Sequence, residues 1–172
     1  PNMPLIAMNR LLRHALEHTY AVGYFESWNL ESLLAVVDAA EKTKSPVIIG
    51  FNGTFLGNDE RRVAENIYHY GSLCKSIAEQ AAVPVSLLLN EADKVQLLVQ
   101  ALQVGFNGIM YVDEHATFEE TIEITKYLVQ TAHYCEAYVE GEVGELPTAD
   151  ITTNTLSAGA LTDPERAAFF VE

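Results

Sequence analysis

The chain of 172 residues carries 24 Asp and Glu against 10 Lys and Arg, which gives a formal net charge of −14. So acidic a chain repels a phosphate backbone, and no basic stripe offsets the charge, so we expect no nucleic-acid partner. With 49% hydrophobic residues the chain can bury one sizeable core. Its length predicts a single domain that covers residues 1–172.

Membrane and redox signals are both weak in this sequence. No apolar run approaches the roughly 20 residues that span a bilayer, and the N-terminus lacks the order of a signal peptide. Only Cys74 and Cys135 are present, each inside a helical pattern rather than in a CxxC pair, which indicates neither a disulfide framework nor a zinc knuckle. We therefore expect no membrane partner and a cytoplasmic location.

The first elements in chain order alternate between helix and strand. Apolar residues at helical spacing predict an amphipathic helix over residues 7–18. A short strand over 21–27 follows, and Asn29 is the expected N-cap of a helix that runs to about Lys44. A second strand, PVIIGFN, begins at Pro46, with glycines punctuating the loop after it.

The middle of the chain holds the most informative stretch, VPVSLLLNEAD at residues 83–93. Before it, helical spacing predicts a helix over 60–81, and after it a helix over 95–102 closed by Gly105. The stretch itself is an unbroken apolar run that ends in one amide and two acids. This pattern is typical of a strand buried on both faces whose last residues reach the cleft above the sheet.

The last elements repeat the same alternation. A fourth strand is expected over 108–113, and a Thr–Glu pair with capping-box spacing begins at Thr117, in front of another helical pattern. A fifth strand is expected over 136–143. After a polar, turn-rich segment, a second capping-box pair begins at Thr162, before a final helix.

Five strand–helix repeats at a spacing of roughly 25 to 30 residues predict right-handed βαβ units and a parallel sheet. Five units would form an open sheet, whereas eight would close a barrel. No GxGxxG or GxxxxGK[ST] motif follows any strand, which counts against a dinucleotide or P-loop site. An α/β barrel, or part of one, is the favoured architecture.

The residues themselves resemble a family. MPLIAMNRLLRHALEHTYAVGYFESWNLES is similar to the start of the class II, metal-dependent fructose-bisphosphate and tagatose-bisphosphate aldolases, and the match continues through SPVII, AVPVSL, VGFNGIM and VEGEVGEL. Members of that family are (β/α)8 barrels. The resemblance implies an incomplete TIM-barrel type of α/β fold, with an N-terminal capping helix, the first five β/α units, and the C-terminal part absent.

The third strand departs most from the family pattern. Where the family has His-x-Asp-His, this chain has Leu88, Leu89, Asn90 and Glu91. Asn90 can hydrogen-bond a substrate oxygen but cannot give up and regain a proton near neutral pH, so the general acid/base role is lost at that position. Glu91 can still bind a divalent cation, and a carboxylate in place of imidazole shifts the preference from the family's zinc toward Mg²⁺ or Mn²⁺.

Other positions of the family's site are also changed. Glu142 matches the family's metal-associated Glu, with Glu140 two residues earlier on the same strand face. On the fourth strand the family's Asp is replaced by Val112, with Asp113 one residue on. Asn52 stands where the family often has a Ser near the substrate phosphate.

Polar side chains gather at or near the C-terminal ends of the expected strands. They are Glu26, Asn52, Asn90, Glu91, Asp113 and Glu142. Barrels place their chemistry at this end, and acids collected at one mouth indicate a cation site. The alternative is that these strand ends are simply solvated and that GEVGE is an acidic turn. Among the histidines, only His115 follows a strand and is considered as a ligand.

The sequence therefore predicts three groups of site residues. The candidate catalytic residues are Asn90 and Glu91, and the candidate substrate-binding residues are Asn52 and Glu26. The candidate ligands of a divalent metal ion, zinc in the family and Mg²⁺ or Mn²⁺ here, are Glu91, Glu142, Glu140 and His115.

The resemblance favours an enzyme of carbohydrate metabolism. It implies a class II aldolase-like lyase for metal-assisted cleavage or condensation of a phosphorylated ketose or related aldol, with altered catalytic residues. The alternatives are a catalytically inactive binding protein with the aldolase fold, and a truncated half barrel with a structural role. The expected partners are a small-molecule substrate and further copies of the chain in a homo-oligomer.

Overall fold

The structure is a computed structural model that describes residues 4–56, 58, 62, 65–144, 149–150, 155–156 and 161–172. Two compact units make up the chain, Pro1–Glu140 and Gly141–Glu172. The single domain over residues 1–172 stays a prediction. None of the helices in the described part of the chain has the length and apolar character needed to cross a membrane.

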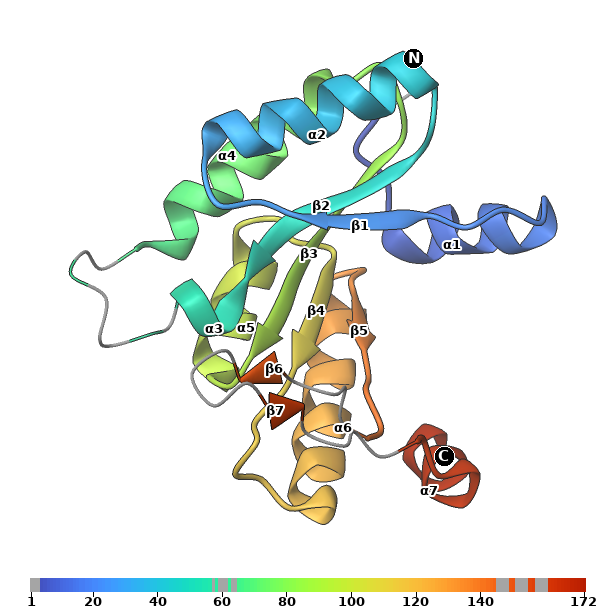
Figure 1. Cartoon of the computed structure of the whole chain (residues 1–172), viewed down its shortest axis with the longest axis vertical. Coiled ribbons are helices and arrows are strands. Elements are labelled where there is room, and N and C mark those ends of the chain that lie inside the picture. The colour runs from blue at the N-terminus through green and yellow to red at the C-terminus, as the bar shows by residue number, and fades with distance from the viewer. Residues whose placement is uncertain are drawn as a thin grey trace. The chain divides into compact units, whose positions relative to one another are not determined.

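The first unit is built on a five-stranded sheet in which every neighbouring pair is parallel and the strand order follows the chain (Figure 1). The strands are β1 (Gly23–Glu26), β2 (Val47–Asn52), β3 (Val85–Ala92), β4 (Gly108–Tyr111) and β5 (Tyr138–Glu140). The helices are α1 (Met8–Glu17), α2 (Leu30–Thr43), the short α3 (Gly53–Leu56), α4 (Ile67–Gln80), α5 (Val95–Gln103) and α6 (Phe118–Tyr134). The predicted alternation of parallel strands and helices is confirmed.

The central strands of the sheet are buried on both faces, which explains their continuous apolar runs. All six residues of β2 are buried. Alternate residues such as Ile49 and Leu89 join a large core with apolar residues of α2, α4, α5 and α6. On the opposite face, Ile48 and Leu88 pack with Met8 and Leu11 of α1. We call these the helix side and the α1 side of the sheet.

Capping residues fix several helix ends as the sequence predicts. The Asn29 side chain accepts a hydrogen bond from the backbone N–H of Ser32 at 2.9 Å and caps α2. Thr117 and Glu120 form the expected capping box at the start of α6. Gly105, with a φ of +104°, follows α5 in the left-handed region that favours glycine.

Other boundaries differ from the prediction for local reasons. The expected helix over 60–81 begins at Ile67, after an Asn66 cap, and most of its expected first turn lies outside the described residues. The expected strand over 136–143 contracts to β5, because Glu136 turns the chain with a φ of +57°. The helix α3 was not predicted.

The second unit contains one antiparallel strand pair and one helix among its described residues. The strands β6 (Ala149–Asp150) and β7 (Thr155–Leu156) fall in the segment expected to be turn-rich, and the helix is α7 (Pro164–Val171). The capping box predicted at Thr162 is wrong. Asp163 is the N-cap instead, and its carboxylate accepts from the backbone N–H groups of Glu165 and Arg166.

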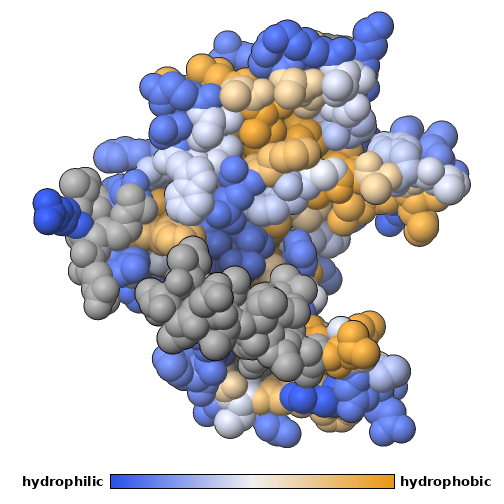
Figure 2. Space-filling view, in the orientation of Figure 1, coloured by the Kyte–Doolittle hydropathy of each residue, from blue (hydrophilic) through white to orange (hydrophobic). Residues whose placement is uncertain are grey.

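Apolar side chains also reach the surface near the first strand of the sheet. Phe25, Leu30 and Leu34 are exposed, and Figure 2 shows apolar residues gathered around α2 and β1. Within the described residues, β1 and β5 each pair with a strand on one side only. Both outer edges of the sheet therefore carry backbone groups available for pairing.

The helix-side core predicts a large difference between two leucine substitutions. Leu89 is 0% exposed, whereas Leu16 on α1 is 82% exposed. We expect Leu89→Ala to lower the free energy of unfolding by about 2–5 kcal/mol, through lost burial and a residual cavity. Leu16→Ala should change it by about 0.5 kcal/mol or less. Urea unfolding of both variants measures this, and equal losses would contradict the assignment of Leu89 to the core.

Candidate functional site

Asn52 joins the ends of two neighbouring strands. It is the last residue of β2, is 8% exposed, and lies beside Asn90 of β3 in the strand register. Its Oδ1 accepts hydrogen bonds from the backbone N–H groups of Thr54 at 3.0 Å and Phe55 at 3.3 Å, where α3 begins. Because those groups can only donate, the orientation of the amide is fixed, and Nδ2 donates to Oε2 of Glu91 at 2.8 Å.

Glu91 lies in a β-bulge at the end of β3. Leu89 pairs with Ile109 and Ala92 with Tyr111, so that Asn90 and Glu91 together oppose a single residue of β4. Leu89 and Ala92 both belong to the helix-side core. Glu91 accommodates the bulge by adopting a φ of +49°. This left-handed backbone conformation costs a non-glycine residue roughly 1–2 kcal/mol. The bulge lets the Glu91 carboxylate reach Asn52.

The turn after β2 holds this bulge in place. The Thr54 hydroxyl donates to the backbone carbonyl of Glu91 at 2.5 Å. Gly53 permits the close approach, because a Cβ at that position would lie 2.4 Å from the Cβ of Ala92. The strained backbone at Glu91 is therefore fixed by hydrogen bonds to both its side chain and its main chain.

Acidic side chains lie near Tyr24 at the C-terminal ends of the strands. We call the region of Glu26, Glu91 and Glu140 the carboxylate mouth. The Tyr24 hydroxyl donates to Oε2 of Glu26 at 3.4 Å. Burial raises the pKa of Tyr24, and the negative charges of Glu26 and then Glu91 raise it further. Glu140 ends β5 and is exposed as a residue, yet partial burial of its carboxyl group, followed by the charge of Glu91, raises its pKa. Glu91 is therefore within electrostatic reach of both Tyr24 and Glu140, and Tyr24 is hydrogen-bonded to Glu26.

The structure brings some of the predicted site residues together and leaves others apart. Glu26, Asn52, Glu91 and Glu140 interact directly or through Tyr24, and Asn90 lies next to Asn52. His115 is exposed in the loop after β4, where its backbone N–H donates to Asp113. Glu142 belongs to the second unit.

Within the part of the chain that the structure describes, no three His, Cys, Asp or Glu side chains are placed to hold a metal ion. The ligand set of Glu91, Glu140, Glu142 and His115 therefore stays a prediction.

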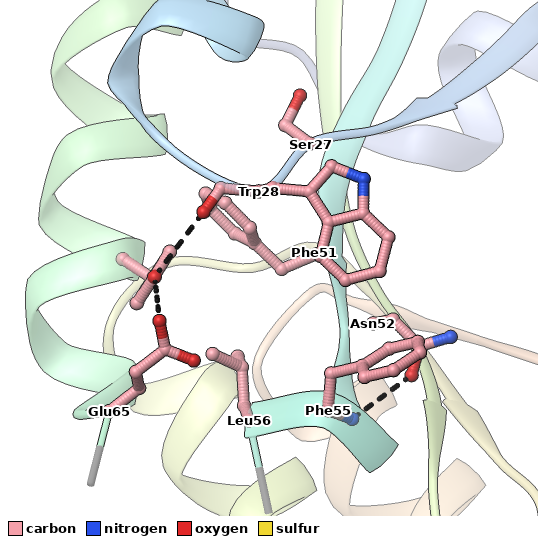
Figure 3. A pocket seen from close by; sticks show the side chains of 8 residues that line it. Ser27, Trp28, Phe51, Asn52, Phe55, Leu56 and Glu65 are labelled. Carbon is pink, nitrogen blue, oxygen red and sulfur yellow. Dashed lines mark hydrogen bonds between the residues drawn. The ribbon is translucent and has the colours of Figure 1, made fainter. Parts of the chain in front are cut away.

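A small aromatic hollow adjoins Asn52 (Figure 3). Its cavity volume of about 10 Å³ leaves room for roughly one water molecule. Trp28 and Phe55 meet edge to face at its rim, with ring centroids 4.8 Å apart. The Tyr70 hydroxyl donates to Glu65. The hydroxyl of Ser27, which also lines the hollow, is buried and has no hydrogen-bond partner among the described residues.

No role was predicted for Tyr24 or Thr54, although both belong to the observed network. Tyr24 could have been found because it precedes Glu26 by two residues, which places both on one face of a strand. Thr54 directly follows the loop glycine, and no sequence signal shows that its hydroxyl reaches the backbone of Glu91. The bulge itself has no sequence signature, since glutamate rarely adopts a positive φ.

The architecture defines an α/β protein with a candidate site at the C-terminal ends of parallel strands. The family described as class II fructose-bisphosphate aldolase matches residues 6–172. The chain therefore belongs to the class II fructose-bisphosphate aldolase family.

Individual relatives agree with this family. The Escherichia coli (strain K12) protein YdjI is 35% identical over 153 residues, which are 89% of this chain and 53% of YdjI. A fructose-bisphosphate aldolase from Thermus caldophilus is 31% identical over 169 residues, which are 98% of this chain and 53% of that protein. The chain spans about half the length of the curated relatives it matches.

Solved structures show the same fold. The crystal structure of the YdjI aldolase from Escherichia coli K12 matches with a TM-score of 0.76 and 31% identity, covering 97% of this chain and 57% of that one. A crystal structure described as a putative fructose-1,6-bisphosphate aldolase from Coccidioides immitis matches with a TM-score of 0.69 and 26% identity, covering 94% of this chain and 55% of that one. The predicted fold, part of a TIM-type α/β barrel, is confirmed.

The contact between Asn52 and Glu91 predicts a pH-dependent effect of Asn52→Asp. The new carboxylate can still accept from the backbone N–H groups of Thr54 and Phe55, but it lies against the carboxylate of Glu91. Two adjacent negative charges repel, so the folded pair retains one shared proton. The pKa at which the folded pair loses this proton therefore rises above the unfolded value of about 4. The variant should match the wild type at about pH 4 and lose roughly 1–3 kcal/mol of stability as the pH rises to about 8. Urea unfolding across this range measures the effect.

Asn29→Asp is the matched control, because aspartate serves equally well as an N-cap and none of the described carboxylates accepts from Asn29. Its stability should follow that of the wild type throughout. A stability loss for Asn52→Asp that does not change with pH would contradict the observed contact.

Carboxyl NMR provides a second prediction at the mouth. The pKa of Glu140 should lie above 4.5, and Glu91→Gln should lower it without restoring the ordinary value, because burial is the larger cause. Because the folded pKa is raised, Glu140 favours folding only while protonated, and this contribution is lost as the pH rises through the folded pKa. Glu31→Gln on α2 is the control and should leave the pKa of Glu140 unchanged. An unchanged pKa in Glu91→Gln would place the two carboxylates farther apart.

Proposed function

We propose that this chain carries part of an aldolase-type lyase site that acts on a phosphorylated ketose or a related aldol. Family membership supports the reaction class. The observation that carries the proposal is the Glu91 carboxylate, which Asn52 holds at the C-terminal ends of β2 and β3, beside Asn90. A carboxylate fixed at this edge of a parallel sheet is suited to move a proton on a bound substrate.

The roles in this proposal follow from what each group can donate or accept. In aldol cleavage a hydroxyl proton leaves as a carbon–carbon bond breaks, which yields an aldehyde and an enediolate, and condensation is the reverse. Asn90 orients a substrate oxygen by hydrogen bonding, because an amide does not exchange protons near neutral pH. Glu91 accepts and returns the proton, and Glu26 is linked to it through Tyr24.

Asn52 acts in this proposal mainly as a positioning residue. All three of its amide hydrogen bonds are made within the protein, and the residue is 8% exposed. Glu26 is the more accessible of the two predicted substrate-binding residues, since it is half-buried on β1. A substrate hydroxyl is a suitable partner for its carboxylate.

Class II aldolases generally use a divalent metal ion. Glu91 and Glu140 offer two carboxylates at one mouth, but the described residues do not complete a metal site. Oxygen ligands of this kind favour Mg²⁺ or Mn²⁺ over the zinc of the family. Glu142 and His115 are the further ligands that we propose, and the proton-transfer roles given above use only the side chains of this chain.

The setting of the protein is also part of the proposal. We place it in the cytoplasm, in carbohydrate metabolism, with a small-molecule substrate and assembly into a homo-oligomer. The outer edges of β1 and β5, unpaired within the described residues, favour pairing with further chain or a second copy. The same observation favours the second candidate function, a half barrel with a structural or binding role and no catalysis.

An activity assay on the protein tests the reaction class. Wild-type protein should not detectably cleave fructose 1,6-bisphosphate, because Asn90 cannot act as an acid. Asn90→Asp, which restores the acid of the family, should raise cleavage by roughly 10²-fold or more. Glu91→Gln should abolish turnover of any aldol that the protein accepts, and Glu31→Gln, distant on α2, should not.

Robust zinc-dependent cleavage of fructose 1,6-bisphosphate by the wild type would overturn the roles given to Asn90 and Glu91. Calorimetric binding of a phosphorylated ketose, with no turnover in the wild type or in Asn90→Asp, would favour the binding protein instead.

A further inference from the structure

Two histidines lie one above the other on the last turn of α1, away from the carboxylate mouth. His14 and His18 are four residues apart, which places them on one face of the helix. Their ring centroids are 4.0 Å apart and their planes are inclined by only 14°. Both residues are exposed. Met8, Leu11 and Ala15 are buried and anchor α1, so the backbone spacing between the two rings is fixed.

Hydrogen bonds to Nδ1 orient both rings. Nδ1 of His18 bonds the backbone carbonyl of His14 at 2.9 Å. A carbonyl only accepts, so the proton of neutral His18 must reside on Nδ1 and the lone pair on Nε2. Nδ1 of His14 bonds the Tyr20 hydroxyl at 2.8 Å, and a hydroxyl can accept that proton in the same way. Within the described residues, neither Nε2 atom has a hydrogen-bond partner.

We propose that the Nε2 atoms of His14 and His18 bind one divalent ion of the class that prefers imidazole, namely Ni²⁺, Cu²⁺ or Zn²⁺. Metal-bound histidines commonly donate the other ring N–H to a carbonyl or similar acceptor, as His18 does to His14. Small rotations of the exposed rings about their Nδ1 hydrogen bonds direct both Nε2 lone pairs to the ion. Water fills the remaining positions, because the site supplies two protein ligands.

The ion would link two successive turns at the end of α1. The chain leaves the helix there through Thr19, with a φ of +56°, and continues toward β1. A link between His14 and His18 favours the helical conformation of that turn over its unfolded alternatives. The site therefore makes the stability of α1 dependent on the metal, independently of any reaction at the carboxylate mouth.

Calorimetric titration of tag-free protein with NiCl₂ tests the proposal, with MgCl₂ as the probe for oxygen-ligand sites. We expect about one Ni²⁺ per chain, a roughly tenfold or larger loss of affinity in His14→Gln and in His18→Gln, and no measurable binding to this site in the double variant. His69→Gln, an exposed histidine on α4, is the matched control and should bind as the wild type does. Glu91→Gln should also retain the site.

Thermal unfolding supplies a second readout. At a nickel concentration of about ten times the dissociation constant, the wild type should melt roughly 3–6 °C higher than without metal, and the double histidine variant should not shift. Melting of the variants without metal shows that each is folded. Equal nickel affinity in the wild type and the double variant, or loss of binding in Glu91→Gln rather than in the histidine variants, would overturn the proposal.

Discussion

The hydrogen bond from Asn52 to Glu91 is the interaction on which the site depends. It joins the ends of β2 and β3, and it requires the bulge that gives Glu91 a φ of +49°. A regular strand would direct Glu91 toward the helix-side core, where an ionised carboxylate would lack both water and a partner. The bulge avoids that cost at the smaller expense of one strained residue, which Thr54 and Asn52 hold from the neighbouring turn.

The packing of the sheet explains why this strain can be maintained. β2 and β3 are central strands, and the residues around the bulge, Leu89 and Ala92, are anchored in the helix-side core. The rigid sheet therefore fixes the backbone, while the polar residues at its C-terminal ends remain open to the mouth. The charge of Glu91 then extends to Tyr24 and Glu140, whose pKa values it helps to raise together with their burial.

The sequence predicts the fold better than the site. Runs such as Val85 to Leu89 are almost wholly apolar, which is typical of buried parallel strands, and all five strands could be located along the chain. Local side-chain chemistry likewise identified the cap at Asn29. The same reasoning wrongly predicted a cap at Thr162, because the Asp163 carboxylate accepts from the backbone N–H groups at the start of that helix. The bulge could not be predicted, since strict alternation places Glu91 on the wrong side and only tertiary contacts with Thr54 and Asn52 reverse it.

A crystal structure with resolved side-chain oxygens tests the central claim most directly. It should show Glu91 with a positive φ, opposite β4 in a bulge, with its carboxylate accepting from Nδ2 of Asn52 at about 2.8 Å. The Thr54 hydroxyl should point to the Glu91 carbonyl in the same electron density. An extended Glu91 whose side chain turns toward the helices, with Asn52 bonded elsewhere, would contradict the account.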